Sequence, residues 1–238
     1  NIWASMLNHA GFTTAVGGIS STGITQSNGS TSLQPGDPVG VMLMRGDLTI
    51  AGTGTVTLVE DDRVYAFGHP FYNLGSAQYP MTRAQVTTLL PSLAISSRIA
   101  EIGEILGTID QDRSTGIYGS IGTEPAMIPV TVTLDTPDKS ASESFHFEII
   151  DNELFSPLLT YTGVLNTLFS WTQGVGAGTY DITTVAQIRN QPPVSFQNMF
   201  TGSTAAISAA LSTATPLSTL LSNAFDSVSI ESIDVAVT

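Results

Sequence analysis

Three histidines are the residues of this chain best suited to proton transfer near neutral pH. His69 has a context that fixes its position, because it stands between Gly68 and Pro70, directly after an apolar run that ends at Phe67. A histidine on a fixed backbone at the end of a strand has what a general base needs, since its ring must reach the proton of a nucleophile. The alternative interpretation is a histidine that caps a tight turn.

The other two histidines have no comparable context. His146 alternates with Phe145 and Phe147, so a strand here would turn its ring away from both phenylalanines, toward solvent or a polar rim. His9 stands near an apolar terminus without a partner in the sequence. Zinc sites built on paired histidines need spacings that are absent here. The chain also has no cysteine, which excludes disulfides, thiolate ligands and cysteine nucleophiles.

Two acidic residues, Asp110 and Asp112, flank Gln111 and precede Arg113. One hypothesis makes Asp112 the acid that orients a histidine base. A second makes the acidic residues a structural ion pair with Arg113 that fixes the turn after it. A calcium site is a third hypothesis, because calcium takes oxygen ligands, although the segment lacks the spacing of a calcium-binding loop. The sequence leaves these alternatives open.

The elements that position these residues are predicted to be mostly β-strands. Glycine, proline and acidic turns separate short runs rich in β-branched and apolar residues, which is the pattern of a sandwich or barrel. The tract 17–32, rich in Gly, Ser, Thr and Asn, predicts a loop or linker. The predicted strands cover 39–44, 52–59, 63–67, 104–109, 116–121, 127–134, 143–150, 180–188 and 229–237.

Helical spacing is found mainly in the last third of the chain. Ser156 is predicted to cap a helix that has Pro157 in its first turn and whose apolar positions continue to Phe169. Two short helices are predicted over 203–211 and 215–221. An earlier segment with helical spacing covers 82–99 and is interrupted by Pro91. The sequence therefore predicts a mainly β fold with added helices.

Neither an internal repeat nor a domain boundary is evident, so we expect one domain over 1–238. Within it, residues 1–35 form an N-terminal extension, 36–150 a β-rich motif region and 151–238 a helix-containing closing region. The first residue, Asn1, and the alternating end of the chain both look like cuts, which favours a processed chain or a longer parent protein.

Charge and composition exclude several classes of function. Charged residues make up 11% of the chain, and the net charge is −13. This charge argues against binding a phosphate backbone, which needs a basic face, and against docking on anionic lipid. No apolar run is long enough to span a membrane. We expect no cofactor, and we expect protein or peptide partners, including further copies of the chain.

The 57 Ser and Thr residues, the single lysine and the absence of cysteine are typical of bacterial surface and periplasmic proteins. They favour a secreted, periplasmic or cell-surface location in a bacterium. Solubility in such a chain depends on hydroxyls, amides and net charge.

The order of several motifs resembles one family. Gly-Thr-Gly-Thr-Val-Thr at 52–57, followed by a turn and Ala-Phe-Gly-His-Pro-Phe at 66–71, is similar to the core signature of the SpoIVB-type serine peptidases. These are the stage IV sporulation protein B peptidases and their uncharacterised bacterial relatives. The similarity continues through 103–119 and 125–132, so that it covers about residues 36–135.

This resemblance implies a chymotrypsin-like double β-barrel in which a serine nucleophile works with a histidine base and an acidic residue. His69 matches the histidine of the family's Gly-His motif, and Asp112 is the candidate acid. The family carries its nucleophile later, in a Gly-Met-Ser-Gly-Ser turn, which residues 135–238 do not contain. Ser120, in the run Gly-Ser-Ile-Gly, and Ser114 are the hydroxyls that the motif region offers instead.

Two functions remain as hypotheses. The first is a serine endopeptidase-like domain, with His69 as base and lost or residual activity. It predicts a hydroxyl within about 3 Å of His69. The alternative is a non-catalytic structural or assembly module of the cell surface or of a filament, built on the peptidase fold. A third hypothesis is that the missing catalytic parts lie outside residues 1–238.

Overall fold

The computed structural model describes residues 32–91, 97–135, 142–171 and 177–238. These residues form two compact units. The first unit combines the described residues up to Val41 with Ala51–Glu124, and the second combines Met42–Ile50 with Pro125–Thr238. These limits differ from the predicted subdivisions after residues 35 and 150, and the single domain over 1–238 stays a prediction.

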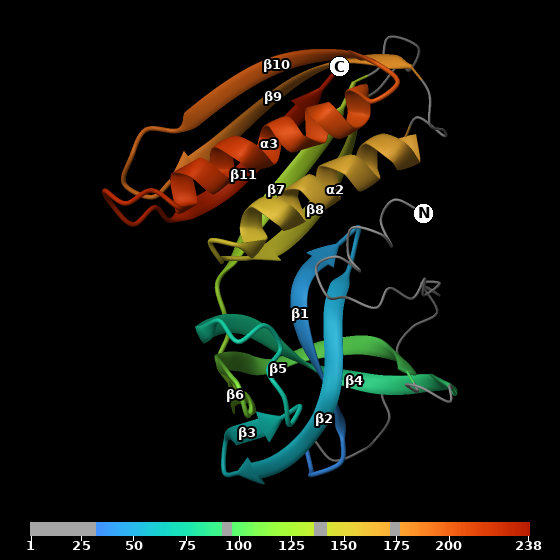
Figure 1. Ribbon diagram of the computed structural model, residues 1–238, viewed down its shortest axis with the longest axis vertical. Helices are drawn as coiled ribbons and strands as arrows, with labels where there is room; N and C mark the ends of the chain where they lie inside the picture. The colour runs from blue at the N-terminus through green and yellow to red at the C-terminus, as the bar shows by residue number, and fades with distance from the viewer. Residues whose placement is uncertain (1–31, 92–96, 136–141, 172–176) are drawn as a thin grey trace. The chain divides into compact units, whose positions relative to one another are not determined.

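Among the described residues, six strands lie wholly or partly in the first unit, each hydrogen-bonded to the next in the order β1-β2-β3-β6-β5-β4 (Figure 1). β4 also pairs with β1 at Val39–Val41, so the pairing closes into a cycle. The strands are β1 (Pro38–Gly46), β2 (Ile50–Glu60), β3 (Arg63–Ala66), β4 (Gly75–Leu90), β5 (Ser97–Arg113) and β6 (Gly116–Ile121). Its core includes the buried side chains of Val39, Val41, Val56, Val64, Tyr79, Met81, Ile109 and Ile117.

The helical spacing at 82–99 wrongly indicated a helix. The described residues of this segment lie in β4 up to Leu90 and in β5 from Ser97 onward. The register of β4 against β5 shifts at four places between Ser76 and Thr88, and each shift breaks the two-residue alternation that identifies a strand. Most of the last six residues of β4 are exposed, so no buried face marks its period there.

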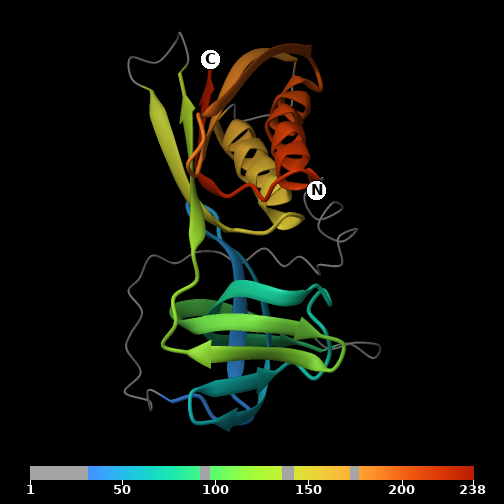
Figure 2. The same ribbon diagram turned by 90° about the vertical axis from the view of Figure 1, so that its left-hand side faces the viewer.

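The second unit is a sheet with two helices on one face, which Figures 1 and 2 show from two sides. Its strands follow the order β10-β9-β11-β7-β8, and β8 pairs further with Met44–Gly46 of β1. These pairs are antiparallel except for β11 and β7, which run parallel. The elements are β7 (Met127–Leu134), β8 (Glu143–Ile150), α2 (Phe155–Trp171), β9 (Gly178–Ile188), β10 (Val194–Gly202), α3 (Ala205–Leu221) and β11 (Ile230–Val237).

Neither helix of this unit contains a charged residue. Buried Val164, Leu165 and Leu168 of α2 and buried Ala209 and Ala210 of α3 give the two helices their apolar sides, and the small alanines allow the helices to pack closely. The buried threonine hydroxyls of α2 donate to carbonyls one turn earlier, and these bonds remove most of the cost of burying them.

The two short helices predicted over 203–211 and 215–221 form the single helix α3. Pro216, expected to begin the second helix, lies inside it. A proline removes the hydrogen bond to the carbonyl four residues earlier. Hydroxyls around this point donate to carbonyls of the preceding turn, as those of Thr213 and Thr215 do. Leu217 is fully buried just beyond the proline and holds the second part in place.

The cap of α2 is Asn152 rather than the predicted Ser156. Its Oδ1 accepts the amides of Leu154 and Phe155 at 3.0 and 3.1 Å, and the helix begins at Phe155. The Ser156 hydroxyl instead accepts the amide of Asn152 and donates to the carbonyl of Ile150, each at 2.9 Å. This hydroxyl therefore joins the end of β8 to the start of the helix.

The mainly β architecture with helices toward the C-terminus is confirmed. Each predicted strand coincides with, or lies largely inside, an observed one, whereas β4 and β10 were not predicted as strands. The predicted loop at 17–32 lies, apart from Ser32, outside the described residues. In the part of the chain that the structure describes, no helix is both long enough and apolar enough to cross a membrane.

The substitution Thr82→Val is expected to stabilise the first unit. The Thr82 hydroxyl is buried and has no hydrogen-bond partner among the described residues. Because valine keeps the shape and removes this desolvated group, we expect the free energy of unfolding to rise by about 1 kcal/mol in urea denaturation. Thr167→Val is the matched control, since that buried hydroxyl donates to the carbonyl of Gly163. An equal gain in both variants would contradict the explanation.

Candidate functional site

The loop that follows β3 and includes the first residue of β4, residues 67–75, carries the Gly-His motif on an unusual backbone. Phe67 has φ of 74° and Gly68 has φ of 72°, both in the left-handed region. For a bulky residue such as Phe67 this conformation costs about 1–3 kcal/mol, so the surrounding structure must hold it in place. Asn73 and Gly75 also have positive φ, at 59° and 86°.

Asp112 is the residue that holds this loop. It lies fully buried near the end of β5, opposite Gly75 in the register of β4. Its Oδ1 accepts the amide of Phe71 at 2.8 Å, and its Oδ2 accepts the amides of Tyr72 and Leu74 at 2.6 and 3.5 Å. A buried carboxylate is stable only when such donors surround it, and here the donors are the backbone of the loop itself.

Aromatic rings pack side by side along the same loop. Phe71 contacts the rings of Phe67, Tyr72 and Tyr79 with centroid separations of 5.9, 4.8 and 6.5 Å, all near edge-to-face. The ring of Phe67 in turn lies 5.6 Å from that of His69. Aromatic pairs in this geometry stabilise the fold by more than the burial of their apolar area alone would.

The glycines of the Gly-Thr-Gly motif make room for these rings. A Cβ atom on Gly54 would lie 2.1 Å from the ring of Phe67, and one on Gly52 would lie 2.6 Å from the ring of Phe71. No side chain fits at such distances. The two motifs that the sequence places apart are therefore in direct contact, and the glycines are required by the packing of β2 under the loop.

Burial raises the pKa of both tyrosines of this cluster. It raises the pKa of Tyr79 to about 12, and the nearby Asp112 carboxylate adds to the increase. The pKa of Tyr72 is raised further, first by burial and then by Tyr79. Both phenols remain neutral across the physiological range, so their rings form an apolar surround for the loop.

His69 is exposed at the surface of the first unit. Its Nδ1 donates to the carbonyl of Pro70 at 2.8 Å. A carbonyl oxygen only accepts, so this bond requires a proton on Nδ1, and of the two neutral tautomers it fits the one with a lone pair on Nε2. The ring can therefore accept a proton or a hydrogen bond at Nε2.

Ser120 does not lie beside His69 in the strand register. Its hydroxyl donates to Oδ2 of Asp110 at 2.8 Å. Ser120 is paired with Arg63 at the start of β3, whereas the end of β3 leads to His69. The start and the end of β3 are three residues apart, which is about 10 Å along a strand. Ser114, the other candidate, lies exposed in the turn between β5 and β6.

No hydrogen bond joins His69, Asp112 and Ser120 to one another within the described ranges. Asp112 accepts hydrogen bonds from the loop amides. The predicted structural ion pair with Arg113 is wrong, because that guanidinium donates to Gln111 at 2.6 and 2.9 Å. The catalytic roles of the three residues stay a prediction.

The remaining sequence hypotheses concern metals and the other histidines. Among the described residues, no group of three or more acidic or histidine side chains is placed to hold a metal ion. His146 is exposed on β8 while Phe147 is buried, as the alternation indicated. His9 lies outside the described residues.

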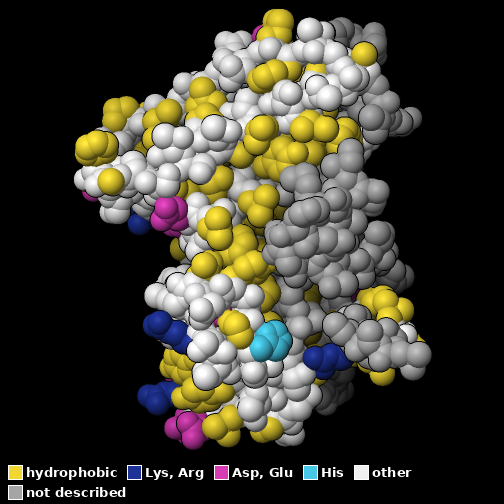
Figure 3. All heavy atoms as spheres, viewed as in Figure 1, with side chains coloured by type: hydrophobic (Ala, Val, Ile, Leu, Met, Phe, Trp, Pro, Cys, Tyr) yellow, Lys and Arg dark blue, Asp and Glu magenta, His cyan; other side chains and the backbone are white. Residues whose placement is uncertain are grey.

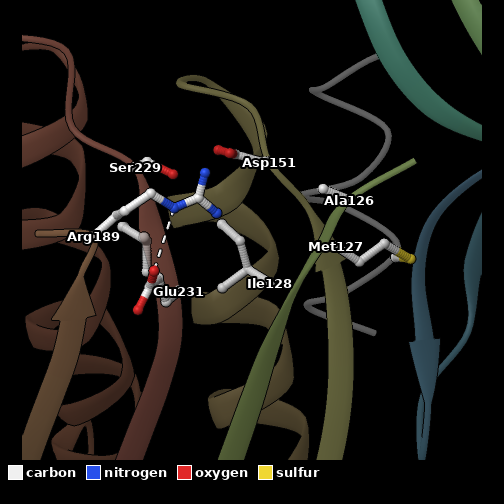
Figure 4. A pocket seen from close by; sticks show the side chains of 8 residues that line it. Ala126, Met127, Ile128, Asp151, Arg189, Ser229 and Glu231 are labelled. Carbon is white, nitrogen blue, oxygen red and sulfur yellow. Dashed lines mark hydrogen bonds and ion pairs between the residues drawn. The ribbon is translucent and has the colours of Figure 1, made fainter. Parts of the chain in front are cut away.

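The second unit carries a pocket of about 240 Å³ that the sequence did not reveal (Figure 4). Its charged residues are far apart in the chain, so only the fold brings them together. The lining residues come from the starts of the parallel strands β7 and β11 and from just beyond the ends of β8 and β9: Ala126, Met127, Ile128, Asp151, Arg189, Ser229, Ile230 and Glu231.

An ion pair dominates the electrostatics of this pocket. Arg189 Nε donates to Glu231 at 3.2 Å, and the guanidinium points toward Asp151 in Figure 4. Desolvation raises the pKa of Asp151, and the Arg189 charge opposes that increase. Both members of the ion pair are more than half exposed, at 61% and 51%, and such pairs contribute little. The loop of the first unit is the stronger candidate for a functional site.

Three comparisons with known proteins leave the family open. A scan against protein-family models, a search of curated proteins and a search of solved structures each found no match to the chain.

Replacing Asp112 by Asn is expected to loosen the loop. The amide group offers one accepting oxygen where the carboxylate offers two, so at least one loop amide loses its acceptor. We expect unfolding free energy to fall by about 2 kcal/mol, with faster hydrogen exchange at Phe71 and Tyr72. Asp110→Asn is the control, because that residue accepts a hydroxyl that an amide oxygen also accepts. Equal losses in the two variants would count against the role of Asp112.

The substitution Gly54→Ala is expected to displace Phe67. The added methyl group would overlap the ring, and we expect a loss of about 1–3 kcal/mol from overpacking. Gly103→Ala serves as control, since its Cβ would meet Arg83 Cβ at 3.4 Å, an ordinary contact, and we expect a change within about 0.5 kcal/mol. Thermal denaturation of both variants measures the difference. A neutral Gly54→Ala would show that the ring has room to move.

Proposed function

We propose that this chain is a SpoIVB-type peptidase-like domain that acts by binding a protein or peptide rather than by cleaving one. The observation that supports this proposal most is the hydrogen bonding of the candidate residues. His69 bonds to the carbonyl of Pro70, and the Ser120 hydroxyl bonds to Asp110. A nucleophile must bond to its base to be activated, and within the described residues this pair does not.

The loop 67–75 is the surface that we assign to partner binding. Asp112 and the aromatic cluster hold its backbone, while His69 and Leu74 remain exposed on it, Leu74 at 40%. A surface that is ordered before binding loses little conformational entropy when a partner arrives. Apolar contact at Leu74 and an accepting nitrogen on His69 would suit an extended peptide with donors along its backbone.

The finer fold prediction, a chymotrypsin-like double β-barrel, receives support from the first unit only. The cycle of six paired strands there is the connectivity that one such barrel needs. The second unit has the open order β10-β9-β11-β7-β8 and gives no such support. We therefore propose that the first unit is the peptidase-like part, in a secreted or envelope protein of a bacterium.

A second candidate function rests on the tautomer of His69. The bond from Nδ1 to Pro70 leaves a lone pair on Nε2, which is the state of a general base. A carbonyl here takes the position that an acidic residue has in a serine peptidase. Catalysis would then require a nucleophile from a residue other than Ser120.

Labelling with a fluorophosphonate, read by intact mass, separates the two candidates. For the native protein we expect no adduct under conditions that fully label a serine peptidase of known activity. An adduct that disappears in His69→Ala would overturn the binding proposal and establish a histidine-activated serine. Ser120→Ala is the matched control, because an adduct that survives it would place the nucleophile at another residue.

A further inference from the structure

The edge of the second sheet lacks the features that normally protect an exposed strand. β10 is its outer strand, bonded to β9 through nine consecutive residue pairs without a register shift. Among the described residues, no strand pairs with its other side. Edge strands are usually protected by charges, prolines or bulges, and β10 contains none of these between Val194 and Gly202.

The uncharged character extends well beyond the strand. No charged residue occurs between Arg189 and Asp226, a segment that contains β10 and α3, although the chain carries a net charge of −13. In Figure 3 the surface over α3 is correspondingly apolar or uncharged. Met199 and Phe225 are exposed in this segment, at 67% and 99%. Two copies of this acidic chain repel each other through their charged surfaces. At the uncharged segment they can approach without bringing like charges into contact.

The sequence of β10 is complementary to itself when a second copy runs antiparallel. In an antiparallel ladder, residues whose N–H and C=O groups point toward the partner strand lie opposite each other. A two-fold axis that relates two copies of a strand must therefore pass through the middle of a pair formed by one residue and its own copy. With the axis at Asn198, Phe196 faces Phe200, and Ser195 faces Thr201. Aromatic pairs and hydroxyl pairs across strands are both stabilising.

We propose that β10 pairs antiparallel with β10 of a second copy of this chain, with the two-fold axis at Asn198, and joins the two second-unit sheets into one. The register uses all nine residues of the strand. Pro192 and Pro193 lack amide donors just before it, and Gly202 ends it with a φ of 112°, so the ladder is bounded at both ends. This inference concerns the second unit and does not depend on the peptidase-like assignment of the first.

Single cysteines test the proposed register directly, because the chain has none of its own. Residues that face each other across antiparallel strands have Cα atoms about 4.5–5.5 Å apart, within the range that a disulfide spans. Under mild oxidation Asn198→Cys should form a covalent dimer. Ser195→Cys is the matched control, since its two copies would lie about 20 Å apart along the ladder.

A mixture of two variants sharpens the test. Ser195→Cys and Thr201→Cys should each remain monomeric when oxidised alone, yet should cross-link when mixed. We expect Asn198→Cys to cross-link at least about tenfold faster than Ser195→Cys, because pairing gives its thiols a high effective concentration. Equal rates for Asn198→Cys and Ser195→Cys would overturn the proposal, as would cross-linking of Ser195→Cys alone at the rate of the mixture.

Sedimentation equilibrium supplies an independent measurement on the chain without cysteines. We expect a concentration-dependent dimer whose dissociation constant rises at least about tenfold in Asn198→Asp, since two carboxylates would then face each other. Asn223→Asp is the control, because it adds the same charge outside β10. A chain that stays monomeric at millimolar concentration, or a dimer that both variants weaken equally, would overturn the proposed interface.

Discussion

The first unit depends on the bonds between the buried carboxylate of Asp112 and the backbone amides of the loop at 67–75. A charge removed from water requires several donors, and here the loop amides supply them. The loop conformation that presents these amides holds Phe67 in the left-handed region and places the phenylalanine rings over the glycines of β2. The position of His69 follows from these contacts.

This arrangement gives a structural account of motifs that look catalytic in the sequence. The two glycines of β2 make room for aromatic rings, and the acid near the end of β5 binds amides. Of the side chains in these motifs that are candidates for catalysis, the imidazole of His69 is exposed and has its Nε2 available for a hydrogen bond. Packing and backbone hydrogen bonding thus account for these motifs whether or not a nucleophile is present.

The second unit reaches stability by different means. Its helices carry no charge, and their threonine hydroxyls bond to the carbonyls of their own helix. An antiparallel strand pair precedes each helix, so β7-β8-α2 and β9-β10-α3 repeat one order of elements without a repeat in sequence. The second of these modules carries the uncharged outer strand, where contact with another copy involves no charge repulsion.

Local patterns by themselves determined most of the strands, the mainly β class and the apolar character of the last third, because alternation and composition act within a few residues. They failed where the two-residue alternation of a strand was interrupted. Register shifts interrupt it in β4, and the polar residues Gln197 and Asn198 interrupt it in β10. Single local signals also misplaced the cap of α2 and divided α3 at Pro216. Only the tertiary structure decided what Asp112, Ser120 and Arg113 bind, because a hydrogen-bond partner is chosen by proximity in space. Strand register determines that proximity, because it places Asp112 opposite Gly75 and Ser120 opposite Arg63 and Thr108.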